Sequence, residues 1–111
     1  IVGGGMTGVS TAYQLGKRGL KVVLLEGGRL ASGQTARTTA HLTYRPEDKL
    51  KHLIGQQGHN RLKLFLEAHR KAIDVIEDVI LLENIQCDFK RTDGHLFLGD
   101  HDSLSTLEEE A

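Results

Sequence analysis

Apolar residues in the first part of the chain follow first a strand-like and then a helix-like pattern. Ile1 and Val2 precede a run of glycines, and Ala12 and Leu15 then lie on one face of a predicted helix that ends at Gly19. Residues 22–25 form a continuous apolar run, Val-Val-Leu-Leu, which is typical of a parallel strand buried on both faces. The order strand, helix, strand predicts a βαβ unit.

Helical spacing dominates the middle of the chain. A long helix is predicted from residue 59 to about residue 83, because apolar side chains recur there every three or four positions. A shorter helical segment is predicted over residues 47–57, and residues 103–111 also have a helical pattern. The apolar positions of the long helix would form one buried stripe: Leu62, Phe65, Leu66, Ala72, Ile73, Ile76, Val79 and Ile80.

Two further segments have no helical spacing of apolar residues. Residues 27–46 are rich in Gly, Ser and Thr and have no period, which predicts a long ordered loop of functional importance. Residues 87–91 and 95–98 flank Asp93-Gly94, two residue types that tolerate positive φ. This arrangement predicts a β-hairpin.

The glycines after Val2 have the spacing of a dinucleotide-binding fingerprint. Gly3 would allow a tight turn, Gly5 would let a pyrophosphate approach the backbone, and Gly8 would let the helix pack closely on the strand. The first N–H groups of that helix would point at the phosphates. A glycine turn that merely caps a helix in an ordinary α/β domain is the alternative, and the flanking elements favour the fingerprint.

Glu26 follows the second apolar run, about twenty residues after the glycines, where the fingerprint requires an acid. Its carboxylate is expected to accept hydrogen bonds from ribose hydroxyls and to repel a 2′-phosphate. FAD or NAD is therefore favoured over NADP.

These elements predict an α/β fold. It would consist of a Rossmann-like βαβ unit with a parallel sheet, a long helix and the start of an antiparallel substrate domain. We assign residues 1–86 to the dinucleotide-binding domain and residues 87–111 to the start of the second domain. The chain has 111 residues and only two precede the glycines, whereas a strand usually has about five. We expect an amino-terminal portion of a larger protein, inactive by itself.

Composition excludes some functions. The 14 basic and 15 acidic residues are interspersed and give a net charge of −1, so the chain lacks the basic footprint of a nucleic-acid-binding protein. The single cysteine, Cys87, cannot form an internal disulfide, and neither a signal peptide nor a membrane-spanning apolar run is found. We expect a cytoplasmic protein, and the sequence leaves its oligomeric state open. The histidines lack zinc-ligand spacing, and no metal site is predicted.

The segments SGQTARTTAHLTY and CDFKRTDGHLFL make the chain similar to a known family. It resembles the amino-terminal part of FAD-dependent oxidoreductases related to D-amino-acid oxidase and glycine oxidase. The resemblance extends over essentially the whole chain. It is closest to a bacterial subgroup whose flavin domain is often followed by a Rieske iron–sulfur domain, whose ligands would have to come from sequence outside this chain.

The resemblance implies a set of FAD contacts. Gly3, Gly5, Met6, Thr7 and Gly8 would contact the pyrophosphate, Glu26 the adenosine ribose, and Arg29 the adenine end, and Gly27 would also contact the cofactor. Gln34 and Thr35 would lie along the diphosphate and ribityl portion, and Thr39, Ala40 and His41 would lie nearest the isoalloxazine. Some relatives attach flavin to a histidine in this loop, but Arg37 stands at the corresponding position, so attachment there is not expected. The His41 ring could hydrogen-bond flavin or substrate, or could merely pack while its backbone makes the contact.

The family resemblance implies oxidation of an amine or amino acid, with hydride transfer from a CH–NH group to flavin. No catalytic acid or base can be named within the chain. Two alternatives remain: an NAD-dependent dehydrogenase, which the long loop after Glu26 disfavours, and a non-catalytic dinucleotide-binding module.

Overall fold

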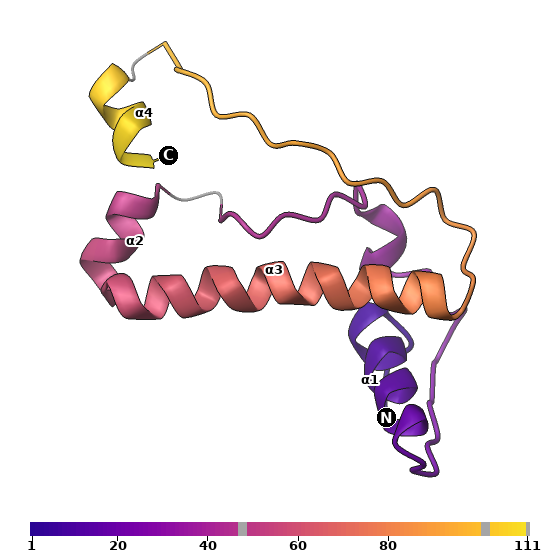
Figure 1. Cartoon of the computed structure of the whole chain (residues 1–111). Coiled ribbons are helices and arrows are strands. Elements are labelled where there is room, and N and C mark those ends of the chain that lie inside the picture. Colours follow the sequence, from indigo (N-terminus) through magenta and orange to yellow (C-terminus); the bar gives the residue numbers. More distant parts are fainter. Residues whose placement is uncertain (47–48, 101–102, 111) are drawn as a thin grey trace. The chain divides into compact units, whose positions relative to one another are not determined.

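The computed structural model describes residues 1–46, 49–100 and 103–110. By its internal contacts the chain divides into two units, Ile1–His41 and Leu42–Ala111. Figure 1 labels the α-helices of both units. The domain division at residues 86 and 87 stays a prediction.

The first unit contains helix α1, Met6–Lys17, and a 3₁₀ helix η1, Gln34–Arg37. Helix α1 begins after Gly5 and has Arg18 as its C-cap, and Gly19 follows with a φ of 78°. Glycine adopts this left-handed conformation without strain, so it suits the end of a helix. The predicted first helix and its glycine stop are therefore confirmed. The predicted loop after Glu26 contains η1, which its sequence pattern did not indicate.

The prediction of a parallel-sheet α/β fold is wrong for the described residues, which contain no strand or sheet. The segment at Ile1 lies beside residues 23–25 through one isolated parallel bridge, between Val2 and Leu25. Two hydrogen bonds make it: Gly3 N–H donates to Leu25 O at 2.8 Å, and Leu25 N–H donates to Ile1 O at 2.9 Å. Too few residues pair to form a strand. Val23 and Leu25 are 69% and 59% exposed, so the apolar run is not the buried strand that was predicted.

The second unit is built around α3, His59–Leu82, with α2, Leu50–Gln57, and α4, Leu104–Glu110. Gly58 separates α2 from α3 with a φ of 80°, and its N–H donates to Ile54 O at 2.8 Å. Helix α2 contacts both α3 and α4. The long helix is confirmed with its carboxyl end one residue earlier than predicted. Part of the predicted shorter helix, residues 47–48, lies outside the described residues.

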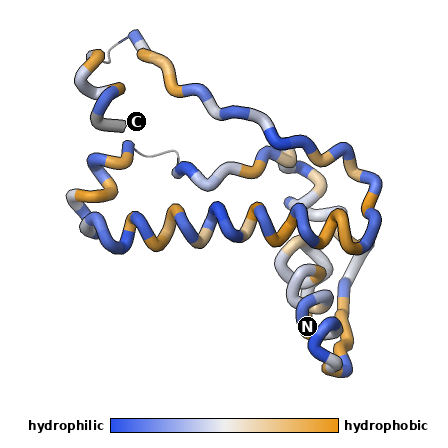
Figure 2. Tube along the Cα trace, in the orientation of Figure 1, coloured by the Kyte–Doolittle hydropathy of each residue, from blue (hydrophilic) through white to orange (hydrophobic). Residues whose placement is uncertain are grey.

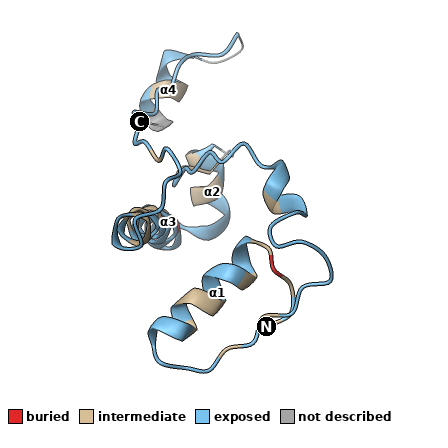
Figure 3. Cartoon of the chain, turned by 90° about the vertical axis from the view of Figure 1, so that its right-hand side faces the viewer, coloured by how far each residue is buried: buried red, intermediate tan, exposed pale blue. Residues whose placement is uncertain are grey.

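The predicted stripe on α3 is only partly buried. Leu62 is 7% exposed, and Leu66, Ile73, Val79 and Ile80 are half-buried. The other three, Phe65, Ala72 and Ile76, are exposed. Figure 2 shows polar and apolar positions alternating along α3, and Figure 3 shows how much of the chain is exposed. The period located the helix, but few neighbouring elements cover its apolar face.

The predicted hairpin at Asp93-Gly94, and with it the start of an antiparallel domain, is also wrong. Residues 89–99 form an extended segment without strand assignment, and neither Asp93 nor Gly94 has the positive φ that a two-residue hairpin turn requires. Leu96, Phe97 and Leu98 are 49%, 82% and 45% exposed. An isolated two-stranded hairpin is only marginally stable, so this pair of segments needs other elements to pack against before it can form.

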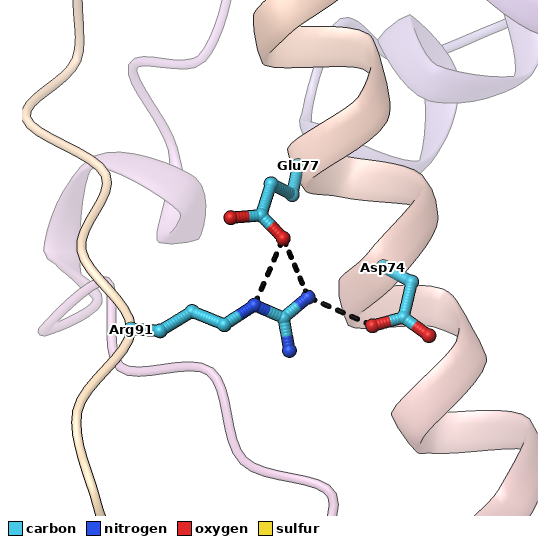
Figure 4. A network of polar contacts seen from close by, with 3 residues as sticks. All are labelled: Asp74, Glu77 and Arg91. Atoms are coloured by element: carbon cyan, nitrogen blue, oxygen red, sulfur yellow. Dashed lines mark hydrogen bonds and ion pairs between the residues drawn. The ribbon is translucent and has the colours of Figure 1, made fainter.

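Arginines attach extended segments of the second unit to α3. Arg91 Nη2 lies 2.7 Å from Asp74 Oδ1 and 2.8 Å from Glu77 Oε2, and its Nε donates to Glu77 Oε2 at 2.9 Å (Figure 4). The hydrogen bonds that Arg91 donates, first to Glu77 and then to Asp74, raise the pKa of its guanidinium. The Arg70 guanidinium lies over the Tyr44 ring, 4.9 Å from its centre. Both attachments are on the surface of the helix.

Candidate cofactor site

The glycine-rich turn has the geometry that its spacing predicts. Gly3 has a φ of +99°, which only glycine adopts readily. A Cβ on Gly8 would overlap the carbonyl oxygen of Gly3, so the start of α1 lies directly against the turn. A Cβ on Gly5 would lie 3.3 Å from Thr35 Oγ1. The turn therefore brings bare backbone close to the beginning of a helix.

A pocket of about 440 Å³ lies in front of this turn. Seven of its lining residues were predicted from the sequence: Gly3, Gly5, Met6, Thr7, Gly8, Gln34 and Thr35. Four were not: Ile1, Val2, Thr11 and Thr38. None of these side chains is charged, so the lining contains no carboxylate that would repel an anion. The segment around η1 and the start of α1 thus face one space although about thirty residues separate them.

The amino end of α1 is directed to the same pocket. Its first turn contains no acidic residue, and its N-cap, Gly5, makes no side-chain capping bond. In an α-helix the first N–H groups have no partner within the helix, so those of Thr7 and Gly8 are suited to an external acceptor. The Met6 N–H donates instead to Thr35 Oγ1 at 3.1 Å. Because a hydroxyl both donates and accepts, Thr35 keeps its own O–H proton for another acceptor.

Glu26 makes backbone contacts beside the turn. Gly4 N–H donates to its Oε2 at 2.6 Å, and Gly28 N–H donates to its Oε1 at 2.9 Å. The bond from Gly4, and then the bond from Gly28, lower the pKa of Glu26 from its usual 4.5. Burial raises this pKa by a smaller amount, and the backbone of Gly27 lowers it a little further. The carboxylate is therefore ionised at neutral pH. Each of its oxygens has a second lone pair for another donor.

Gly4 is a residue that the sequence reasoning missed. It is buried, and its carbonyl accepts a hydrogen bond from Ala31 N–H at 2.9 Å while its N–H binds Glu26. A Cβ there would overlap Leu30 Cδ2 and lie 3.1 Å from Glu26 Cβ. Gly4 occupies a position that the fingerprint leaves unspecified, so its spacing carried no signal.

Thr11 and Thr38 were missed as well. Thr11 lies one helical turn after Thr7 and donates to the Thr7 carbonyl at 2.7 Å, so helical periodicity from Thr7 could have found it. Thr38 follows η1 and lies within the segment SGQTARTTAHLTY, between the predicted residues Thr35 and Thr39, so the resemblance could have found it.

Other predicted residues lie outside the pocket lining. Gly27 and Arg29 are exposed in the segment after Glu26. Thr39, Ala40 and His41 are exposed too, and the structure brings Thr38 to the pocket in their place. Ala40 has a φ of 57°, a left-handed conformation uncommon for alanine. The binding roles of all these residues stay predictions.

The chemistry of the pocket fits the phosphate part of a dinucleotide. It combines N–H groups at a helix start, threonine hydroxyls, glycine backbone and an acid-free lining. Among the described residues no group of three or more His, Cys, Asp or Glu side chains could hold a metal ion. Within the same ranges, no helix has both the length and the apolar character needed to cross a membrane.

The chain belongs to the DAO family of FAD dependent oxidoreductases, whose family model matches residues 1–111. This confirms the family inferred from the sequence. FAD is thus the cofactor of the family, whose members are described as oxidoreductases.

Individual relatives match over nearly the whole chain. It is 36% identical to YhfW of Bacillus subtilis, which is named as a Rieske 2Fe-2S iron-sulfur protein, over 99% of this chain and 22% of that protein. It is 30% identical to OrdL of Haemophilus influenzae, named as an oxidoreductase, over 100% of this chain and 26% of that protein. It is also 30% identical to gamma-glutamylputrescine oxidoreductase of Escherichia coli, over 99% of this chain and 26% of that protein.

The chain spans about a quarter of the length of these curated relatives. No solved structure matches it at a significant level.

Proposed function

We propose that this chain binds the adenosine diphosphate part of FAD in an oxidoreductase that oxidises an amine or amino acid at a CH–NH group. Membership of the DAO family supports the cofactor and the class of reaction. The substrate class is supported by the name of the Escherichia coli relative, gamma-glutamylputrescine oxidoreductase.

The pocket at the amino end of α1 is the observation that carries the proposal. A pyrophosphate there would receive hydrogen bonds from the Thr7 and Gly8 N–H groups and from the Thr35 hydroxyl, in a lining without a negative charge. The helix dipole adds a favourable field for the anion. Glu26, ionised and held beside Gly4 and Gly28, would accept hydrogen bonds from ribose hydroxyls.

The remaining predicted contacts extend along the loop. Arg29 would lie toward the adenine end, with Gly27 as a further contact near Glu26. Gln34 would lie toward the ribityl portion, and Thr39, Ala40 and His41 toward the flavin ring. Bound FAD supplies the redox chemistry, by accepting a hydride from the substrate. The chain's own residues bind and orient the cofactor.

A Rieske cluster would require ligands from outside this chain. The single cysteine, Cys87, is exposed, and such a cluster needs two cysteines and two histidines. The name of YhfW is the reason for testing the full-length protein for iron and acid-labile sulfide.

The visible spectrum of the full-length protein, before and after acid precipitation, tests the cofactor. Flavin bands that pass into the supernatant are the expected result, because Arg37 offers no histidine for covalent attachment. Flavin retained in the pellet would contradict the noncovalent assignment. A colourless protein that binds NAD would overturn the proposal in favour of a dehydrogenase.

Anaerobic reduction of the bound flavin tests the substrate class. Bleaching of the flavin by an amine or amino acid, gamma-glutamylputrescine among them, is expected. If no amine reduces a flavin that dithionite does reduce, the non-catalytic alternative is favoured.

A further inference from the structure

The Glu26 carboxylate connects two backbone segments that are far apart in the sequence. Its Oε2 accepts from Gly4 N–H at 2.6 Å across 22 positions, and its Oε1 accepts from Gly28 N–H at 2.9 Å. Both bonds are made to the protein's own backbone. Glu26 therefore acts on the protein itself, in addition to any contact with a bound nucleotide.

Gly4 also binds the segment after Glu26 through its carbonyl group. Its carbonyl accepts from Ala31 N–H at 2.9 Å, so both backbone groups of this buried residue bind the segment of residues 26–31. Leu30 lies against its Cα, where a Cβ would overlap the Leu30 side chain. Gly4 stands between Gly3 and Gly5, whose backbone borders the pocket. The shape of the turn and the position of the following loop are thus set by one group of contacts.

We propose that Glu26 is a positioning residue that holds the glycine-rich turn in its binding shape before a cofactor arrives. The proposal deepens the proposed function and rests on it for the identity of the ligand. Ordering the turn in advance removes an entropic cost that binding would otherwise have to meet. The segment of residues 26–31 and the turn then form one prepared surface.

A carboxylate suits this task for a chemical reason. Both backbone partners are N–H donors, and an ionised carboxylate presents acceptors on both oxygens. A glutamine has nearly the same shape, but its amide nitrogen is a donor. In Glu26→Gln one of the two N–H groups, on Gly4 or on Gly28, must therefore face another donor and lose its bond.

Cofactor affinity cannot test this idea, because Glu26 is also expected to bind ribose. The diagnostic state is the flavin-free, full-length protein, followed by hydrogen–deuterium exchange resolved to single amides in residues 1–8. In the wild type we expect the Gly4 amide to exchange much more slowly than an unstructured amide. Exchange at the unstructured rate without flavin, slowed only when flavin is added, would overturn the proposal without any substitution.

The substitution Glu26→Gln gives the second arm, and Glu67→Gln is its matched control. Glu67 is an exposed carboxylate on α3 whose side chain faces Lys63 at 3.9 Å, so its loss removes the same charge elsewhere. We expect Glu26→Gln to speed exchange at Gly4 or Gly28 roughly tenfold, and Glu67→Gln to leave both rates unchanged. Equal rates in Glu26→Gln and wild type would contradict the proposal. If Glu26→Gln unfolds the unit, amides throughout α1 exchange fast, and the wild-type arm alone decides.

The two proposals can fail separately. Slow exchange at Gly4 in a protein that never binds flavin would leave the positioning role standing and overturn the proposed function. Flavin binding to a protein whose Gly4 amide exchanges freely without flavin would support the proposed function and overturn the positioning role of Glu26.

Discussion

Each unit of the chain uses carboxylates to attach a distant segment, and the two attachments differ in the donors. In the first unit Glu26 accepts from the backbone N–H groups of Gly4 and Gly28. In the second, Asp74 and Glu77 on α3 hold the flexible side chain of Arg91. Backbone donors next to a tight turn are already fixed, whereas a long arginine must lose rotamer freedom to form its ion pairs. The comparison indicates that the first attachment defines a geometry and the second only tethers a segment.

The largest effect on stability is expected at Gly8, where α1 packs directly on the glycine turn. In Gly8→Ala the new Cβ would overlap the Gly3 carbonyl oxygen, and a backbone atom cannot move aside as a side-chain end can. We expect a loss of about 1–3 kcal/mol in the free energy of unfolding, together with loss of flavin, measured by thermal unfolding and by flavin content.

Gly16→Ala, on the same helix, is the matched control for Gly8→Ala. A Cβ at Gly16 meets no atom within 4 Å, so the substitution should stabilise α1 by about 0.5–1 kcal/mol. Equal losses in the two variants would show that close packing at Gly8 is unimportant.

The next largest effect is expected on the melting temperature at low pH, where Glu26 becomes protonated. The pKa of Glu26 in the folded protein is lowered from 4.5, so its stabilising contribution is present above about pH 4.5 and is lost as the pH falls through the lower folded pKa. The melting temperature of the wild type should therefore fall more steeply in this range than that of Glu26→Gln. Parallel curves would contradict the role given to the ionised carboxylate.

A smaller effect is expected at Thr35, which binds the start of α1 by its hydroxyl. Thr35→Val keeps the shape but removes the acceptor for Met6 N–H, and we expect a loss of about 1 kcal/mol, as for other helix caps. Thermal unfolding and amide exchange at Met6 measure it. Thr92→Val, an exposed site in the second unit, should change neither quantity. If Thr35→Val and Thr92→Val had the same stability and the same exchange at Met6, the Thr35 hydroxyl would not stabilise the start of α1.

The smallest effect is expected at Arg91. The side chain is 48% exposed, and Asp74 and Glu77 are 41% and 35% exposed, so water and salt screen the ion pairs. Arg91→Gln should leave the melting temperature nearly unchanged while it speeds proteolysis of residues 89–99 at low salt, but not at high salt. Lys90→Gln is the neighbouring control. A large loss of stability in Arg91→Gln would contradict the conclusion that the Arg91 ion pairs only tether a segment.

Local patterns predicted some features well and pairing partners poorly. The spacing of apolar residues located α3 to within one residue, because helical hydrogen bonds join neighbours in the sequence. The run at residues 22–25 and the Asp93-Gly94 turn predicted strands from residue type alone, and both predictions are wrong. A strand exists only when another segment binds along its length. Val2 and Leu25 form a single bridge, and residues 89–99 have no strand assignment, so neither prediction could be met by local sequence alone.

The sequence by itself determined the family, the α-helices and the glycine turn at Gly3 and Gly8, because these depend on residue type and short spacing. Only the tertiary structure decided which groups meet at the pocket. The pairing of Gly4 with Glu26, and of Met6 with Thr35, joins residues 22 and 29 positions apart. The physical reason is that a hydrogen bond depends on where two backbones lie in space, and no period in the sequence records that distance.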